Sequence, residues 1–155
     1  MKTKTTITEL SHDDLVNLFS TALYGSSYLS ASYEEEVERN GRGYFEDILA
    51  NILLHDGEIL ITDHYADGSV YGDIPHKIDE DDNVTYFITY NEIKRGLERA
   101  ANGTFNAGDD EWTEQTKRNA RVSFDSFMDE DRWDFDLVRA DILMQIILFN
   151  EIIYG

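Results

Sequence analysis

Hydrophobic residues recur at intervals of three and four residues along four separate stretches of the chain, a spacing typical of amphipathic helices. The first stretch begins after Ser11, and Asp14 stands three residues later, as in a capping box. Glycines stand where the first, second and third stretches end. The pattern predicts a helix over residues 11–24, a helix from Phe45 that stops at Gly57, a helix capped by Asn91 that ends at Gly103, and a helix over about residues 113–128.

The last part of the chain, from Trp133 to Tyr154, is apolar on more than one face. A helix with that pattern belongs at the centre of a fold, so we expect a long C-terminal helix in the core. Its longest apolar run, residues 142–149, is interrupted by Gln145 and is far shorter than the roughly 20 residues that cross a bilayer. We therefore expect this helix to be part of the core and not of a membrane.

The middle of the chain carries the strand patterns. Residues 58–65 are apolar and β-branched, residues 66–69 have turn chemistry, and residues 70–74 return to a strand-like pattern, which predicts a β-hairpin. Residues 84–89 have the composition of a third strand, whereas the small residues and tyrosines of 25–33 predict an irregular, exposed segment. Helices before and after a short meander indicate an α+β fold, in which a small antiparallel sheet of about three strands packs with four to five helices.

The composition adds a strong negative charge to this picture. The 155 residues contain 32 Asp and Glu against 13 Lys and Arg, a net charge of −19, while 41% of the residues are hydrophobic. This describes a folded protein with an acidic surface, and because no linker or repeat divides the chain, we expect a single domain over residues 1–155. The absence of cysteine excludes thiolate chemistry and suits a reducing compartment, so we expect a cytoplasmic protein. No apolar run follows Lys2 and Lys4, so the beginning of the chain does not resemble a secretory signal.

The acidic residues form several clusters along the chain and are not confined to one tail. Such a surface attracts basic partners and repels nucleic acid, and carboxylates on rigid elements can imitate the phosphate array of DNA toward a DNA-binding protein. Aromatic side chains near these clusters, such as Tyr28, Tyr33, Trp112 and Trp133, would add contact energy. We therefore expect a basic or nucleic-acid-binding host protein as the partner, with no direct contact to nucleic acid or to a membrane. The candidate partner-binding residues are Glu34, Glu35, Glu36, Glu38, Asp79, Glu80, Asp81, Asp82, Asp129, Glu130 and Asp131.

The segment after the first predicted strand has some features of a calcium-binding loop. Asp63, Asp67 and Gly68 match three positions of an EF-hand loop, but Tyr65 and Ile74 stand where two of its ligands are required. We therefore expect a hairpin turn there and no calcium.

His64 and His76 flank the predicted hairpin beside acidic residues, so strand pairing could bring two imidazoles and a carboxylate together. Their spacing matches no metal motif, and the sequence contains neither a Gly-x-Ser-x-Gly elbow nor a phosphate-binding loop. We expect no cofactor and no metal, and a binding protein in preference to an enzyme. One alternative is a small-ligand-binding or enzymatic domain that uses Asp63, His64, Tyr65 and His76. Another is a structural subunit whose isoleucine-rich last helix packs against a second copy, as a homodimer.

Two segments, residues 14–28 and residues 150–155, resemble segments of small, uncharacterised accessory proteins of bacteriophages and mobile elements. The resemblance covers both ends of the chain and parts of the middle. It implies a gene context in which small acidic proteins commonly inhibit host defence, including restriction and CRISPR effectors. It assigns no functional residue.

Overall fold

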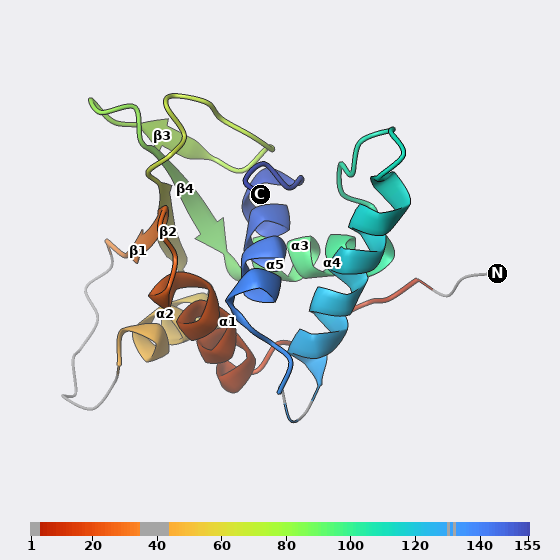
Figure 1. Cartoon of the computed structure of the whole chain (residues 1–155). Coiled ribbons are helices and arrows are strands. Elements are labelled where there is room, and N and C mark those ends of the chain that lie inside the picture. Colours follow the sequence, from red (N-terminus) through yellow and green to blue (C-terminus); the bar gives the residue numbers. More distant parts are fainter. Residues whose placement is uncertain (1–3, 35–43, 130, 132) are drawn as a thin grey trace.

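A four-stranded antiparallel sheet and five helices make up the computed structural model of this protein, which describes residues 4–34, 44–129, 131 and 133–155 (Figure 1). The α+β class is confirmed, with one strand more than expected. The elements are α1 His12–Tyr24, β1 Leu29–Ser32, α2 Phe45–Leu54, β2 Glu58–Asp63, β3 His76–Ile78, β4 Val84–Thr89, α3 Tyr90–Asn102, α4 Thr113–Met128 and α5 Leu137–Phe149.

The strands are arranged in the order β1-β2-β4-β3, and every neighbouring pair is antiparallel. β2 pairs with β4, where Ile61 lies opposite Tyr86, and with β1, where Asp63 lies opposite Leu29. The predicted hairpin between residues 58–65 and 70–74 is therefore wrong.

Residues 70–74 cover a helix instead of extending the sheet. Gly72 has a φ of 75°, and a Cβ at this position would lie 3.0 Å from the carbonyl oxygen of Leu148, so the segment crosses the end of α5 at close range. The backbone N–H of Tyr71 donates to the hydroxyl of Tyr86, which holds the segment there. Because this part of the chain turns toward α5, the place beside β2 is open to β4.

Strand β1 lies within the segment that was predicted to be irregular. Leu29 is buried and Ala31 is half-buried, whereas Ser30 and Ser32 are exposed, which is the alternation of an edge strand with one face toward the core. Four residues with two serines carry too little hydrophobic signal to predict a strand. The pairing with β2 supplies the stabilisation that the local sequence lacks.

Three helices begin and end close to their predicted positions, and two differ. α1 has the expected capping box, in which the N–H of Asp14 donates to Ser11 Oγ and the N–H of Ser11 donates to the Asp14 carboxylate. α3 begins at Tyr90 and not after Asn91. The carboxylate of Glu92 accepts the N–H of Thr89 there, so the cap lies two residues earlier than predicted.

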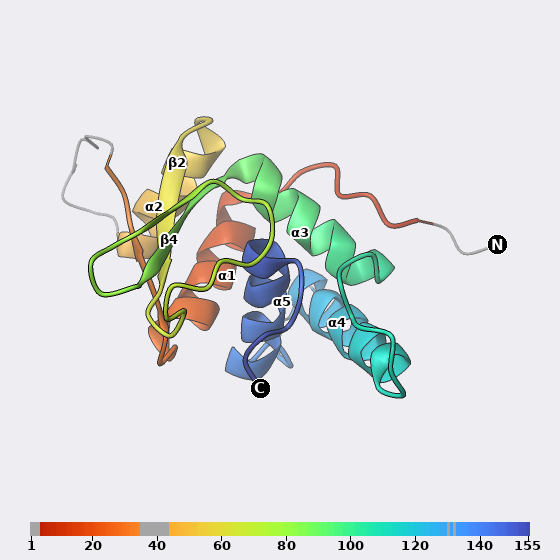
Figure 2. The same ribbon diagram turned by 90° about the horizontal axis from the view of Figure 1, so that it is seen from above.

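The last helix is central but shorter than predicted, because both ends have their own stop signals. Asp136 accepts the N–H of Arg139 as the N-cap of α5, and Asn150 ends the helix with a left-handed φ of 57°. The residues from Ala140 to Phe149 are buried apart from Asp141 and Ile142. Figure 2 shows α5 between the sheet and α1 on one side and α3 and α4 on the other.

The contact between α3 and α5 depends on a glycine. A Cβ at Gly96 would lie 2.6 Å from the Cα of Ile147, so the two helices approach more closely than any side chain at this position would allow. The glycine therefore lets α3 pack directly against α5.

Candidate functional site

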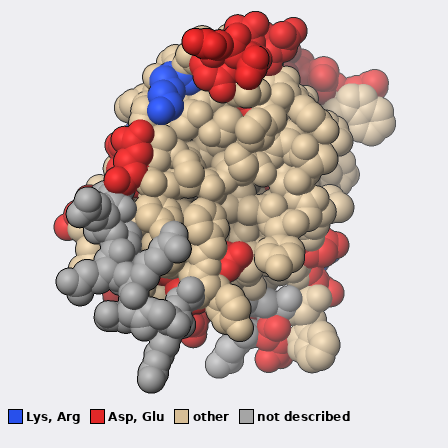
Figure 3. Space-filling model, turned by 90° about the vertical axis from the view of Figure 1, so that its left-hand side faces the viewer, with Lys and Arg blue, Asp and Glu red and all other residues tan. Residues whose placement is uncertain are grey.

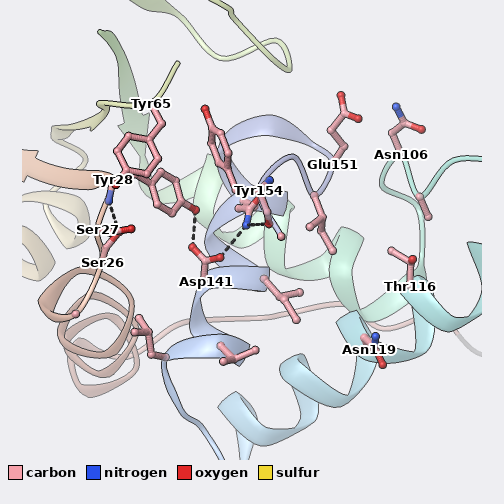
Figure 4. A pocket seen from close by; sticks show the side chains of 18 of the residues that line it. Ser26, Ser27, Tyr28, Tyr65, Asn106, Thr116, Asn119, Asp141, Glu151 and Tyr154 are labelled. Atoms are coloured by element: carbon pink, nitrogen blue, oxygen red, sulfur yellow. Dashed lines mark hydrogen bonds between the residues drawn. The ribbon is translucent and has the colours of Figure 1, made fainter. Parts of the chain in front are cut away.

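A cavity of about 770 Å³ lies where the α1–β1 turn, Tyr65 after β2, the α3–α4 loop, α4, α5 and the C-terminal segment meet (Figure 4). Its lining thus comes from the beginning, the middle and the end of the chain. Its lining is mixed: apolar side chains of α5 and Ile152 lie beside tyrosines, amides and carboxylates.

Three tyrosines form one wall of this cavity. The rings of Tyr28 and Tyr65 are stacked with centroids 5.8 Å apart, and Tyr154 lies 4.8 Å from Tyr28 and 6.3 Å from Tyr65. Tyr28 is buried, whereas Tyr65 is 56% exposed and lies at the mouth. The cavity therefore offers aromatic faces to a ligand, with one ring accessible from solvent.

Two of these tyrosines donate hydrogen bonds to carboxylates that have no cationic partner in the described part of the chain. Tyr28 donates to Asp141 Oδ1 at 2.5 Å, and Tyr154 donates to Asp63 Oδ2 at 2.7 Å. Asp63 is completely buried and also accepts the N–H of Tyr65.

Burial raises the pKa of the Tyr28 and Tyr154 hydroxyls far above the usual tyrosine range, and the hydrogen bonds to the carboxylates raise these pKa values further. Both hydroxyls stay protonated at neutral pH. They act as hydrogen-bond donors that orient carboxylates, and neither is suited to general acid–base catalysis.

Gln145 holds the C-terminal segment against α5. Its Oε1 accepts the N–H groups of Ile153 and Tyr154, and its Nε2 donates to Tyr154 O and to Asp141 Oδ2. Every hydrogen-bonding position of this buried amide is used. Gln145 therefore fixes both the backbone of Tyr154 and the carboxylate of Asp141, two parts of the cavity wall.

The other end of the C-terminal segment is attached to the α3–α4 loop. The N–H of Asn106 donates to the carbonyl of Asn150 at 2.8 Å, and Asn106 and Glu151 form an isolated parallel bridge. These contacts place Glu151 at the cavity, opposite the tyrosine wall (Figure 4).

The charged side chains that line the cavity in the described part of the chain are two carboxylates, Asp141 and Glu151. Asn106, Asn119 and Thr116 add neutral polar groups from the α3–α4 loop and α4. The cavity is therefore suited to a cationic ligand or a ligand rich in hydrogen-bond donors. Among the described residues, no group of three His, Asp or Glu side chains is placed to hold a metal ion.

The acidic residues predicted to bind a partner lie elsewhere on the surface. Glu34 is exposed and forms a 3.8 Å ion pair with Lys77, and Glu80, Asp81 and Asp82 surround the β3–β4 turn. Asp129 and Asp131 are exposed after α4, whereas Glu35, Glu36, Glu38 and Glu130 lie outside the described residues. Figure 3 shows that on one side of the molecule most acidic atoms lie toward the edges and that the middle is largely uncharged.

Asp79 differs from the other acidic candidates because its carboxylate is used within its own turn. It accepts the backbone N–H groups of Asp81 and Asn83 and the side-chain amide of Asn83. These bonds, that of the Asn83 backbone first, lower the pKa of the Asp79 carboxyl. The role of Asp79 in this structure is to stabilise the β3–β4 turn.

The alternative set of Asp63, His64, Tyr65 and His76 is divided by the sheet. Tyr65 lines the cavity and Asp63 is buried, where it accepts hydrogen bonds from Tyr65 N–H and the Tyr154 hydroxyl. His64 lies on the opposite face, where its Nε2 is 2.7 Å from Ser30 Oγ. The ring of His76 contacts the carbonyl of Ile74 and the ring of Tyr86. The two histidines do not form a joint site.

The pair of Ser30 and His64 has the composition of a nucleophile and its base. Both side chains are exposed and lie outside the cavity, and no carboxylate in the described chain is hydrogen-bonded to the second ring nitrogen of His64. The third group that orients such a base is therefore missing from this pair.

Sequence reasoning missed the centre of the cavity, which is formed by Asp141, Gln145 and Tyr154. One signal was present: Gln145 interrupts an apolar run, and Asp141 stands four residues before it, on the same face of a helix. A polar pair on the buried face of a core helix requires partners, and here the C-terminal segment supplies them.

No family model matches this chain, and no curated protein and no solved structure matches it significantly. Within the part of the chain that the structure describes, none of the helices combines the length and the hydropathy that a membrane span requires.

Proposed function

We propose that this chain is an acidic binding protein that receives a cationic segment of a partner protein in the cavity beside α5. The observation that carries the proposal is the lining of that cavity: it offers the carboxylates of Asp141 and Glu151 and a wall of tyrosines, and no described Lys, Arg or His lines it. In a chain with a net charge of −19, such a cavity favours an arginine or lysine side chain over any anion.

The cavity can satisfy both the charge and the stem of such a side chain. The carboxylates accept hydrogen bonds from a guanidinium or ammonium group, and the tyrosine faces attract the cation. Leu137 and Val138 at the start of α5 are 40% and 67% exposed, and they offer apolar contact for the methylene stem and for neighbouring residues of the partner.

The exposed acidic clusters have a different role in this proposal. Glu80, Asp81 and Asp82 in one turn and Asp129 and Asp131 after α4 attract a basic partner over a distance and raise its association rate. A basic, nucleic-acid-handling host protein, including a defence effector, is the partner class that this surface and the bacteriophage resemblance favour. Reversal of the charges in one cluster should then slow partner binding much more than it changes folding.

The first test measures binding of a short arginine-containing peptide, with the same peptide carrying neutral citrulline as the ligand control. The variant Glu151→Gln removes one cavity charge, and Glu9→Gln removes the same charge from an exposed position outside the cavity. We expect Glu151→Gln to weaken arginine-peptide binding about tenfold, as loss of a charged hydrogen bond does, and Glu9→Gln to change it less than about twofold. Equal binding of the citrulline peptide, or equal effects of the two variants, would contradict the proposal.

A second candidate is a site for a small organic cation, and the aromatic wall favours it. A volume of about 770 Å³ suits a small ligand, and the three tyrosines that line the cavity are the residue type whose ring faces bind quaternary ammonium groups. Tetramethylammonium and choline are the probes. Tight binding of either, with no binding of the arginine peptide, would favour the small ligand over the partner protein.

The isoleucine-rich part of α5 is not available for a second copy. Ile146 and Ile147 are buried within the chain, and the large hydrophobic side chains that α5 exposes are Leu137 and Val138 at its start. A homodimer stays a prediction, and in this structure it would have to use another surface.

A further inference from the structure

Six of the 13 basic residues of this very acidic chain lie on α3 and α4, which pack against each other. A second cavity, of about 610 Å³, opens between the end of α3, the first half of α4 and the N-terminal segment. Figures 1 and 2 show the N-terminal segment passing alongside α3 on its way to α1. The charged residues that line this cavity are Lys4, Lys117, Arg118, Arg121 and Glu114.

Specific contacts hold the backbone next to Lys4 and the stem of Lys117 in this second cavity. Asn102, at the end of α3, pairs with Thr5 through two hydrogen bonds, from Thr5 N to Asn102 Oδ1 at 2.7 Å and from Asn102 Nδ2 to Thr5 O at 2.8 Å. This pairing fixes the backbone next to Lys4. Lys117 packs its stem over Gly103, where a Cβ would lie 3.3 Å from Lys117 Cδ. Gly103 has a φ of 65°, so a glycine serves both the end of α3 and the position of the lysine.

The two arginines of the cavity have different roles. Arg121 is engaged through Nε and Nη1, because it donates to Asp125, to Thr5 Oγ1 and to the carbonyl of Ala101, and it thereby joins α4 to the end of α3. In the described part of the chain, Arg118 donates one hydrogen bond, to the neutral side-chain amide of Gln115 at 3.0 Å. In the described part of the chain neither Lys117 nor Arg118 forms an ion pair with a carboxylate.

Cations that remain unpaired in a chain with a net charge of −19 indicate a ligand. Exposed carboxylates outnumber them greatly, and yet α4 directs Lys117 and Arg118 to one concave surface with a single carboxylate, Glu114. We propose that this second cavity binds a compact phosphate group, with Lys117, Arg118 and Lys4 as its donors. The guanidinium of Arg118 matches the geometry of two phosphate oxygens, and the two ammonium groups add point charges.

A compact anion fits this surface better than a long polyanion. At physiological ionic strength, charges more than about 8 Å apart are largely screened, so the local cations dominate for a small ligand. An extended nucleic acid would leave the cavity and pass the exposed carboxylates of residues 109–111 or of Asp125 at the two sides. This inference does not depend on the function proposed for the first cavity.

Titration calorimetry of the full chain with inorganic pyrophosphate tests the inference. The double variant Lys117→Gln/Arg118→Gln should weaken binding at least about tenfold, and Arg95→Gln, which removes a charge from an exposed position of α3 outside the cavity, should change it less than about twofold. Glu114→Gln should tighten binding by a few-fold, a gain that misfolding cannot produce.

Three results would overturn the inference. The first is the absence of saturable binding of pyrophosphate at millimolar concentration. The second is a loss of pyrophosphate affinity in Arg95→Gln as large as that in the double variant, which would show a general effect of net charge. The third is tighter binding of a short single-stranded oligonucleotide than of pyrophosphate, with a steep dependence on salt, which would assign the surface to nucleic acid.

Discussion

The hydroxyl of Tyr154 donates a 2.7 Å hydrogen bond to the carboxylate of Asp63, a residue 91 positions earlier in the chain. Asp63 ends strand β2 and is completely buried, and Tyr154 belongs to the last residues of the chain. This contact joins the C-terminal segment to the sheet and closes the tyrosine wall of the first cavity. The stability of the fold and the shape of that cavity therefore depend on the same hydrogen bonds.

Tyr154→Phe should destabilise the protein by about 1–3 kcal/mol, because Asp63 would keep only the N–H of Tyr65 as a donor in a buried place. The free energy of unfolding, measured with urea at pH 7, checks this. Tyr65→Phe is the matched control, since no hydrogen bond of the Tyr65 hydroxyl is seen in the described chain. Equal stability of both variants would show that the contact contributes nothing.

Gln145→Leu should cost about 2–4 kcal/mol, because two backbone N–H groups and one carbonyl of the C-terminal segment would lose their partner. Amide hydrogen exchange should show faster exchange at Ile153 and Tyr154. The control is Gln115→Leu, the same change at an exposed position of α4. If exchange at the C-terminal segment is unchanged in Gln145→Leu, the role given to this side chain is wrong.

Alkaline pH should unfold the protein through its buried tyrosines. The pKa of Tyr28 is raised above the value of 10.0 that it has when unfolded. The protonated Tyr28 hydroxyl therefore makes its full contribution to stability below about pH 10, and this contribution decreases as the pH rises above that value. Tyr28→Phe should reduce the slope of stability against pH in that window. The absorbance of tyrosine at high pH shows when each tyrosine loses its proton. Ionisation of Tyr28 in the folded protein at the pH of an ordinary tyrosine would contradict this expectation.

Asp79→Ala should lower the melting temperature at pH 7, whereas Glu80→Gln should leave it nearly unchanged, because only the Asp79 carboxylate bonds to its turn. The pKa of Asp79 is lowered from 3.8, so its contribution is present above about pH 4 and is lost as the pH falls below that value. The difference between the two variants should thus shrink in acid. If the difference in melting temperature between the two variants grows as the pH falls, the role given to the Asp79 carboxylate is wrong.

Gly96→Ala should destabilise the protein by about 1–3 kcal/mol, since a methyl group would meet the backbone of Ile147 at 2.6 Å and force α3 away from α5. Gly25→Ala provides the comparison: its methyl group would meet the flexible side chain of Leu137 at 3.0 Å, and the cost should be smaller. Thermal unfolding of both variants measures the difference. An equal cost would mean that the helices adjust their separation freely.

Local patterns predicted most of the helices for a physical reason. A helix forms its hydrogen bonds within one segment, and its caps lie within a few residues, so Ser11 with Asp14 and the glycine at 103 were sufficient to place ends of α1 and α3. The last helix was overextended because its apolar pattern continues past Asn150, while the left-handed turn at that residue ends it.

The pairing of the strands could not be predicted from local patterns in the same way. The period of a strand predicts its faces and gives no information about its neighbours, so the pattern alone favours the nearest strand-like segment, residues 70–74, as the partner of residues 58–65. The close passage of Gly72 over α5 decides that β4 lies beside β2 instead. β1 was missed because an edge strand of four residues depends on its neighbour for stability.

The sequence by itself determined the α+β class and the acidity of the protein, because these depend on composition and on periods within one segment. Only the tertiary structure decided where a ligand could bind. The first cavity joins Tyr28 to Asp141, Gln145 and Tyr154 near the other end of the chain, and the second joins Lys4 to α4. Such sites arise from packing between elements, and a one-dimensional pattern does not record which elements meet.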